Sequence, residues 1–124
     1  MFKLNHILCL TSLIAGYHTQ FINDNFFKFF SQFLFITSEL FWFDGLRNTW
    51  RHKLDVVTAR SYVFYGLCLM KNKKCLNLLN ISIPLLFYVG SRFHSHKKWL
   101  SWKHVFFHGM FHLTAMYAII QSKI

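Results

Sequence analysis

The sequence predicts an all-α fold, a polytopic transmembrane bundle of about five helices. Hydrophobic residues make up 54% of the chain and charged residues 15%, whereas a soluble domain usually carries about a quarter charged residues. Lys and Arg stand mostly in short clusters between apolar runs, which is typical of the charge that flanks membrane spans. The net charge of +10 could also indicate nucleic acid, but the basic residues do not line one polar face. We therefore expect a lipid bilayer as the partner and no nucleic acid.

The chain of 124 residues has the length of a single domain, residues 1–124. Apolar runs of 14 to 19 residues predict spans at 4–22, 26–43, 55–70, 76–89 and 104–120. These runs are shorter than the roughly 20 residues of an untilted span. Flanking Trp, Tyr, Lys and Arg can extend each run by snorkelling, and a bundle of three or four spans is the alternative.

The first run also resembles a secretory signal peptide, because Lys3 precedes the apolar residues 7–15. No A-x-A cleavage site follows, so we predict an uncleaved first span. Asn23-Asp24-Asn25 predicts the turn that follows it. The three cysteines are odd in number, and no disulfide framework is expected.

The second predicted span carries Ser38 and Glu39 near its end and stops at Asp44-Gly45. A basic connection over residues 46–53 follows. Asp55 then opens the third span, at the position where a carboxylate suits a helix N-terminus. An acidic N-terminal residue of this kind needs no chemistry to explain it.

Arg60 lies five residues beyond Asp55, and we expect it to point into the bundle interior or to snorkel. Residues 71–74 predict a tight basic turn, and Pro84 predicts a kink in the fourth span. Residues 90–98 are expected to form a loop before the last span.

The last predicted span carries His104, His108 and His112, four residues apart. On an α-helix such positions lie one above another on the same face. In lipid, three imidazoles would turn toward a protein interior or a wet cavity. They either hydrogen-bond neighbouring helices as packing groups or form a metal or proton-handling site.

Five alternating spans predict an orientation from the basic residues. One side holds eight of them, Lys3, Arg47, Arg51, Lys53, Arg92, Lys97, Lys98 and Lys103. The other side holds five, Lys28, Lys71, Lys73, Lys74 and Lys123. The positive-inside bias therefore predicts an integral membrane protein with its N-terminus in the cytosol.

The same alternation brings scattered polar positions to one membrane face. Ser38 and Glu39 end one span, Asp55 begins the next, and His104 and His108 begin the last. We expect these side chains to converge at one depth of the bundle.

The segment TSELFWFDGLRNTWRHKLDVVTA resembles the junction of the second and third helices in one membrane superfamily. That superfamily joins alkaline ceramidases, progestin and adipoQ receptors, and hemolysin III proteins. Ser38 matches the Ser of its Ser-x-x-x-His motif, and Leu54-Asp55 matches its Leu-Asp pair. His104-Val-Phe-Phe-His108 matches the paired histidines of its last helix.

The resemblance implies a catalytic zinc site. His104, His108 and Asp55 would hold the metal, which activates water for attack on a lipid amide or ester, and Ser38 would steady the oxyanion. Ser38 and Asp55 are then the catalytic residues. The chain departs from the superfamily at Trp42, which replaces a zinc-ligating His, and in having five spans where the superfamily has seven. His52 or His112 could take the place of that ligand.

Two functional hypotheses follow. In the first, the chain is a small multi-pass membrane protein, a non-catalytic relative of the ceramidase-like proteins, whose polar cluster only fixes helix packing. In the second, it is a zinc-dependent intramembrane hydrolase with a lipid substrate. The absence of a metal ligand at Trp42 favours the first.

Overall fold

The computed structural model describes residues 3–124, which form five α-helices and no strand. The helices are α1 (Leu4–His18), α2 (Asn25–Asp44), α3 (Trp50–Asn72), α4 (Leu78–Lys97) and α5 (Trp102–Ser122), with a 3₁₀ turn η1 (Thr19–Phe21) after α1. The predicted all-α class and the count of five helices are confirmed.

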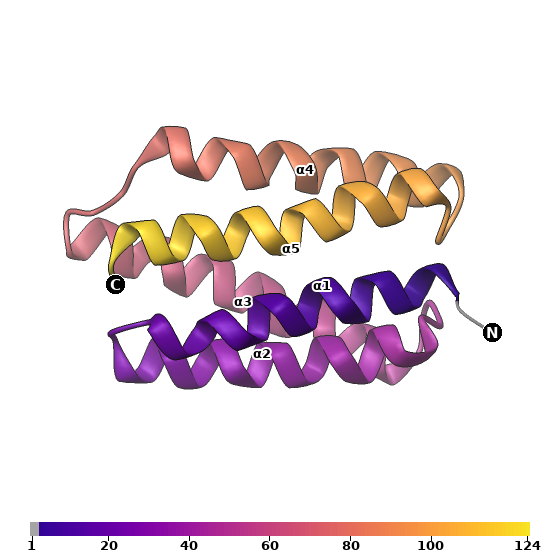
Figure 1. Ribbon diagram of the computed structural model, residues 1–124, viewed down its shortest axis with the longest axis horizontal. Coiled ribbons are helices and arrows are strands. Elements are labelled where there is room, and N and C mark those ends of the chain that lie inside the picture. The colour runs from indigo at the N-terminus through magenta and orange to yellow at the C-terminus, as the bar shows by residue number, and fades with distance from the viewer. Residues whose placement is uncertain (1–2) are drawn as a thin grey trace.

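The helices run alternately in opposite directions along one long axis (Figure 1). At the end that we call the Gly45 end, Trp99 Nε1 donates a hydrogen bond to the Gly45 carbonyl at 2.9 Å. At the opposite end, the Asp24 end, the backbone N–H groups of Asn23 and Asp24 donate to the Ile124 carbonyl at 2.8 and 2.9 Å. The predicted grouping of the connections at two ends is therefore confirmed.

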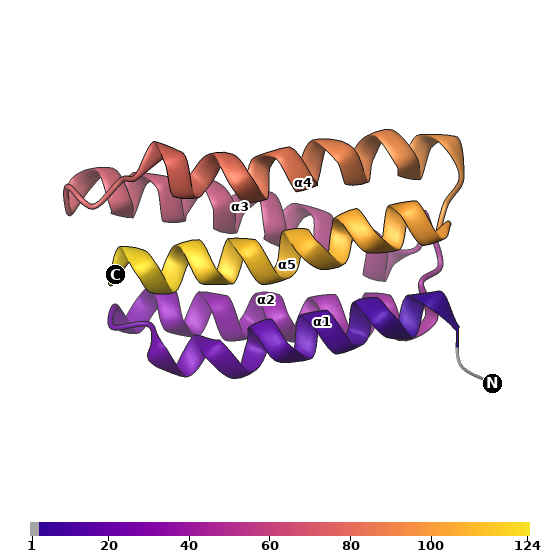
Figure 2. The ribbon, with the colours of Figure 1, turned by 45° about the horizontal axis from the view of Figure 1, so that its top comes forward.

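The packing follows an order that differs from the chain order. Helix α3 packs on α2, α2 on α1, α1 on α5, and α5 on α4. Helix α5 lies between α4 and α1 in both ribbon views (Figure 2). The histidines of α5 are therefore at the centre of the bundle, while α3 and α4 flank it.

Each helix from α2 to α5 begins at a polar residue whose side chain accepts a backbone N–H. These N-caps are Asp24, Thr49, Asn77 and Ser101. Such caps satisfy donors that have no partner within the helix. Gly45 ends α2 in the left-handed region, with φ 65°, where glycine carries no Cβ penalty.

Helices α2 to α5 extend beyond the predicted apolar runs at one or both ends, whereas α1 ends at His18 and is shorter than the predicted span 4–22. Helix α3 begins at Trp50 rather than at Asp55, because Thr49 caps it, and the prediction that Asp55 opens this helix is wrong. Helix α4 continues through Pro84 to Lys97, so the expected loop over residues 90–98 is also mostly helical. Cationic side chains in its last turn suit the negative end of a helix dipole.

Arg60 does not point into the bundle. Its side chain is exposed, on the side of α3 away from the buried residues of that helix. Of the two predicted alternatives, the interior placement is therefore wrong.

Two apolar clusters lie in the interior. The larger one, toward the Asp24 end, contains Ile22, Phe27, Tyr62, Met70, Ile119 and Ile124. Within it the rings of Phe27 and Tyr62 stack with centroids 4.7 Å apart and planes within 3°. The smaller one, toward the Gly45 end, contains Leu8, Phe41, Trp42 and Val105.

Polar residues share the interior with these clusters almost equally. Among residues 3–124, eleven hydrophobic residues are buried, and so are ten polar or charged ones: Asn5, Ser12, Thr19, Ser31, Thr37, Ser38, Asp55, Thr58, Ser91 and His104. The outer surface instead exposes thirty large hydrophobic side chains. Phe43 at 70% exposed and Phe64 at 73% are examples.

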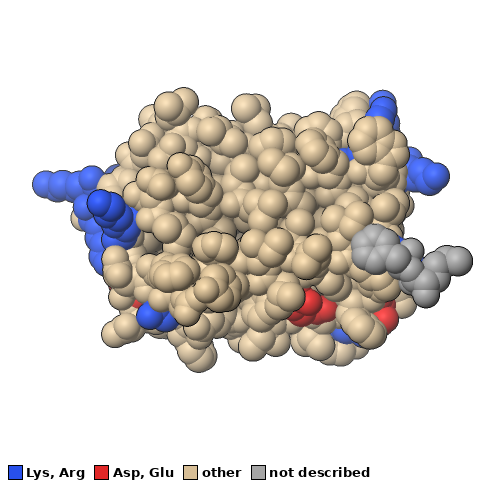
Figure 3. Space-filling model, in the orientation of Figure 1, with Lys and Arg blue, Asp and Glu red and all other residues tan. Residues whose placement is uncertain are grey.

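Figure 3 shows that Lys and Arg gather toward the two ends of the molecule on the face in view. The surface between them consists almost wholly of uncharged residues. By length and hydropathy, none of the helices formed by residues 3–124 qualifies as a membrane span.

Candidate functional site

Ser38 and Asp55 meet in the interior, as the sequence predicts. Asp55 lies in the second turn of α3 and is 7% exposed. Its Oδ1 accepts a hydrogen bond from Ser38 Oγ at 2.8 Å and a longer one from Thr37 Oγ1 at 3.3 Å. Two hydroxyls of α2 thus hold the buried carboxylate of α3.

The three histidines of α5 form the predicted ladder. The ring centroids of His104 and His108 are 5.8 Å apart, and those of His108 and His112 are 4.7 Å apart. His104 is 1% exposed. The ladder begins at the first turn of α5, near the Gly45 end, and reaches the middle of that helix.

Each imidazole uses its Nδ1 for a different partner. The Leu100 backbone N–H donates to His104 Nδ1 at 3.1 Å, within the same turn of chain. His108 Nδ1 lies 2.8 Å from Ser91 Oγ of α4, and His112 Nδ1 lies 3.0 Å from Thr11 Oγ1 of α1. The ladder therefore joins α5 to both helices that pack directly on it.

Trp42 occupies the space between α2 and the ladder. Its ring centroid is 5.0 Å from that of His108 and 6.2 Å from that of His104. It also stacks on Trp99, with centroids 5.9 Å apart and planes within 18°. The residue that the resemblance aligns with a zinc-ligating His is here a buried aromatic contact of the two remaining histidines.

Asp55 and the ladder lie in the same half of the bundle but have separate partners. Asp55 is held by α2, and His108 and His112 are held by α4 and α1. Within residues 3–124 no group of three His, Cys, Asp or Glu side chains could hold a metal ion. As they are arranged, His104, His108 and Asp55 do not fit a zinc ligand set, and the metal centre stays a prediction.

The two substitute ligands do not complete such a set. His52 stacks on Phe41, with ring centroids 4.6 Å apart, and its ring lies 5.6 Å from that of Trp99. His112 is engaged with Thr11. Both imidazoles therefore serve as contacts between helices.

Glu39 is half-buried on the α1 side of α2, beside Ser12. Its Oε1 and the Nε1 of Trp42 are the buried side-chain N or O atoms without a hydrogen-bond partner in the described part of the chain. Both atoms lie toward the Gly45 end, on residues of α2 that are three positions apart. The polar interior of this end is thus not fully satisfied.

The sequence analysis missed three polar residues that contact the α5 histidines or the end of α2. Ser91 fell within an expected loop, and Thr11 lies inside an apolar run without a motif. Asn5 donates from Nδ2 to the carbonyls of Trp42 and Phe43 at 2.8 and 3.0 Å, and so satisfies the last turn of α2. For Thr11 and Asn5 the only signal was a polar residue inside an apolar run, and Ser91 gave none.

Comparison of the chain with protein-family models, with curated proteins and with solved structures finds no match. The resemblance to the ceramidase superfamily therefore depends on Ser38, Leu54-Asp55 and the His104–His108 pair, and it stays a prediction.

Proposed function

We propose that this chain is a multi-pass membrane protein without a catalytic role, in which hydrogen-bonded polar side chains hold the helices together. One observation carries the proposal: ten polar or charged residues are buried while thirty large hydrophobic ones are exposed. Water-soluble domains rarely expose large contiguous apolar surfaces. In lipid the outer surface can be apolar, and polar groups belong inside.

The lengths of four of the five helices support the same proposal, while α1 has 15 residues. Helices α2 to α5 contain 20, 23, 20 and 21 residues. At about 1.5 Å per residue each covers roughly the 30 Å of a hydrocarbon core. Buried polar residues such as Ser38 and Asp55 lower the mean hydropathy of their helices, and so do charged residues near the helix ends.

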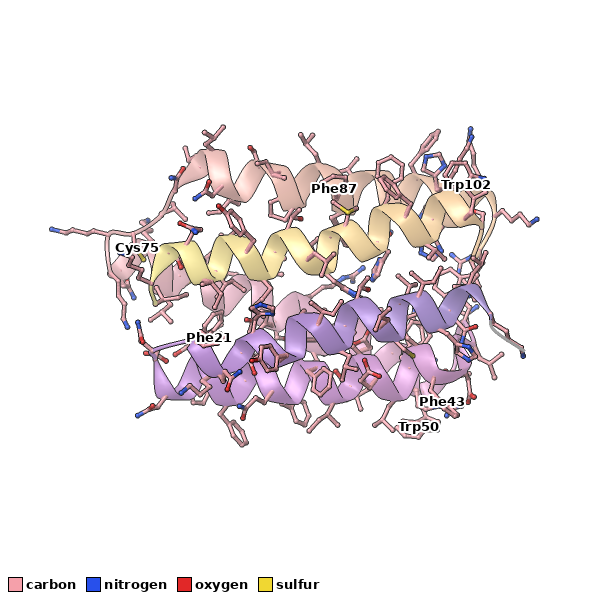
Figure 4. The ribbon with its side chains drawn as sticks, viewed as in Figure 1. Phe21, Phe43, Trp50, Cys75, Phe87 and Trp102 are labelled. Atoms are coloured by element: carbon pink, nitrogen blue, oxygen red, sulfur yellow. The ribbon has the colours of Figure 1, made fainter. Side chains whose placement is uncertain are left out.

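The Gly45 end of the bundle carries aromatic residues that favour a membrane interface. Phe43, Trp50 and Trp102 lie toward the Gly45 end in Figure 4, and they are 70%, 67% and 66% exposed. Exposed Trp near the ends of the helices is typical of the aromatic belts of membrane proteins. Lys and Arg beyond these Trp residues are typical of the flanks of membrane spans.

Membrane residence is tested by expressing the full chain and extracting the membranes with alkaline carbonate. We expect the protein to remain in the membrane pellet, because exposing its apolar surface to water would be unfavourable. Recovery of a monodisperse, detergent-free soluble form would overturn the proposal.

The orientation is tested by labelling single cysteines introduced at Asn48, Ser95 and Asn72, after the three native cysteines have been replaced by serine. Asn48 and Ser95 lie toward the Gly45 end and Asn72 toward the Asp24 end. The proposal expects the first two to react from the cytosolic side and the third from the opposite side. Any other grouping contradicts a five-span topology.

The zinc-dependent lipid hydrolase is the alternative, and metal analysis of protein purified in mild detergent tests it. That alternative expects zinc near one per chain and its loss in His108→Ala. Metal-free protein that keeps its fold would leave the structural role.

A further inference from the structure

Arg60 lies alone on the outward face of α3. The buried residues of this helix are Asp55, Thr58, Tyr62, Gly66 and Met70, spaced by three or four residues and so on one face. Arg60 is on the opposite side and is exposed. Around it the outward face is apolar, with Val57 63% exposed and Phe64 73% exposed, one turn to either side.

Arg60 is also near the middle of the helix. Counted along α3, it lies roughly 15 Å from Trp50 and roughly 18 Å from Asn72. In a hydrocarbon core about 30 Å thick this is close to the midplane. Arginines that snorkel to the interface are found near helix ends, so the position of Arg60 calls for a partner within the membrane.

The described residues supply no such partner from this chain. Asp24 pairs with Lys73 and Asp44 with Arg51, both at the ends of the bundle. Asp55 is held inside by α2, and Glu39 lies on the α1 side, beside Ser12. These are the four acidic residues of the chain.

We propose that the outward face of α3, centred on Arg60, docks a transmembrane helix of another protein that carries a carboxylate near the bilayer midplane. The inference rests on the proposed membrane residence. An apolar face with one central guanidinium is complementary to an apolar helix with one central carboxylate, since charged groups within a membrane pair with each other. Hydrogen bonds between spans then fix the register of the two helices.

A second copy of this chain does not fit the same face. Asp24 and Asp44 lie at the ends of the bundle, paired with Lys73 and Arg51. Of the other two carboxylates Glu39 is the less buried, and it lies only about 8 Å from the end of α2, well away from the midplane. Two copies related by a twofold axis through this face would also bring their Arg60 guanidinium groups together. A lipid phosphate lies at the headgroup level, about half the bilayer core away.

The test uses the full chain in mild detergent and fluorescent poly-leucine peptides of about 22 residues, a length that spans a bilayer. One peptide has Asp at its centre, a second has Leu there and a third has Lys. We expect the Asp peptide to bind about tenfold more tightly than the Leu peptide, the scale of a polar contact between membrane peptides, and the Lys peptide to bind no better than the Leu peptide.

Three variants assign the contact. Arg60→Gln should remove the preference for the Asp peptide, and Arg60→Lys should keep part of it because the charge remains. Arg92→Gln is the matched control, since Arg92 is equally an exposed arginine but lies near the end of α4, and it should keep the full preference. Circular dichroism checks that each variant is helical.

Equal binding of the Asp and Leu peptides by a chain that resists carbonate extraction would overturn the docking inference alone. A preference that survives in Arg60→Gln would do the same. Release of the chain by carbonate would overturn membrane residence and this inference with it.

Discussion

The two halves of this bundle are built from the same five helices but have different interiors. Toward the Asp24 end, α2 and α3 meet through stacked rings, with Phe27 and Tyr62 centroids 4.7 Å apart. Toward the Gly45 end, the same two helices meet through the Ser38–Asp55 hydrogen bond of 2.8 Å. The first contact depends mainly on ring stacking, with the Tyr62 hydroxyl also 2.6 Å from Ser31 Oγ. The second depends mainly on the direction of a hydrogen bond, with Phe41 also stacked on His52.

Under the proposed membrane residence, the difference indicates how a bundle can be specified when its surroundings are apolar. In lipid, apolar burial gives little driving force between helices, so close packing and polar contacts determine which faces meet. In the half toward the Gly45 end, which we call the polar half, hydrogen bonds determine which helix faces pack together. Examples are the contact of Ser91 with His108 and that of Thr11 with His112. In the half toward the Asp24 end, which we call the aromatic half, stacked rings such as Phe27 and Tyr62 fill the space between the helices.

The largest expected effect tests the aromatic half. Phe27 is 1% exposed, and a Cβ added at Gly66 would lie 3.1 Å from its ring, so Phe27→Ala leaves a cavity that α3 cannot easily fill. We expect a loss of about 3–5 kcal/mol in the free energy of unfolding. Titration of the detergent-solubilised protein with a denaturing detergent, followed by circular dichroism, measures it.

Phe29→Ala is the matched control, because Phe29 is on the same helix and is 67% exposed. Its removal should change the free energy of unfolding by less than about 0.5 kcal/mol. Equal losses in the two variants would mean that the two residues do not differ in burial, and the described inward face of α2 would be wrong.

A smaller effect tests the polar half. Ser38→Ala removes the shorter of the two hydrogen bonds to Asp55 and leaves the one from Thr37 at 3.3 Å. A buried acceptor that loses a donor destabilises the folded protein. We therefore expect a loss of about 1–3 kcal/mol in the free energy of unfolding. The same titration measures it.

Ser95→Ala is the control for that variant, since Ser95 is only half-buried and its hydroxyl donates to the Arg92 carbonyl of its own helix at 2.9 Å. Its free energy of unfolding should stay within about 0.5 kcal/mol of the parent. If Ser38→Ala were as mild, the Asp55 carboxylate would not need its α2 partners.

The order and direction of the helices could be predicted from the sequence because apolar runs and basic turns alternate along it. The meeting of Ser38 with Asp55 followed from that alternation, since consecutive antiparallel helices bring the end of one beside the start of the next. Helix ends were less predictable. Thr49 and Ser101 cap helices beyond the apolar runs, and hydropathy marks where a segment stops being apolar rather than where its hydrogen bonds stop.

The partners of the histidines could not be predicted. The four-residue spacing places three imidazoles on one face of α5, but it does not determine which neighbour that face meets. The chain packs α5 between α1 and α4. The ladder therefore meets Thr11, which is 101 residues from His112, and Ser91, which is only 17 residues from His108 but lies in a segment predicted as a loop. Trp42 lies against two of the same imidazoles for the same reason.

The smallest expected effect decides what the ladder does. Because the proposed role of His108 is a hydrogen bond to Ser91 at 2.8 Å, His108→Gln should keep most of it and change the free energy of unfolding by less than about 1 kcal/mol. His108→Leu cannot form the bond. Its coupling with Ser91→Ala in a double-mutant cycle should be about 0.6 kcal/mol, the average for such pairs in membranes, and at most about 1.7 kcal/mol. Coupling near zero would show that the His108–Ser91 hydrogen bond does not contribute to stability. A large loss in His108→Gln would instead mean that the ring itself is required, as packing against Trp42 or as a ligand, and only the second of these predicts bound zinc in the parent protein.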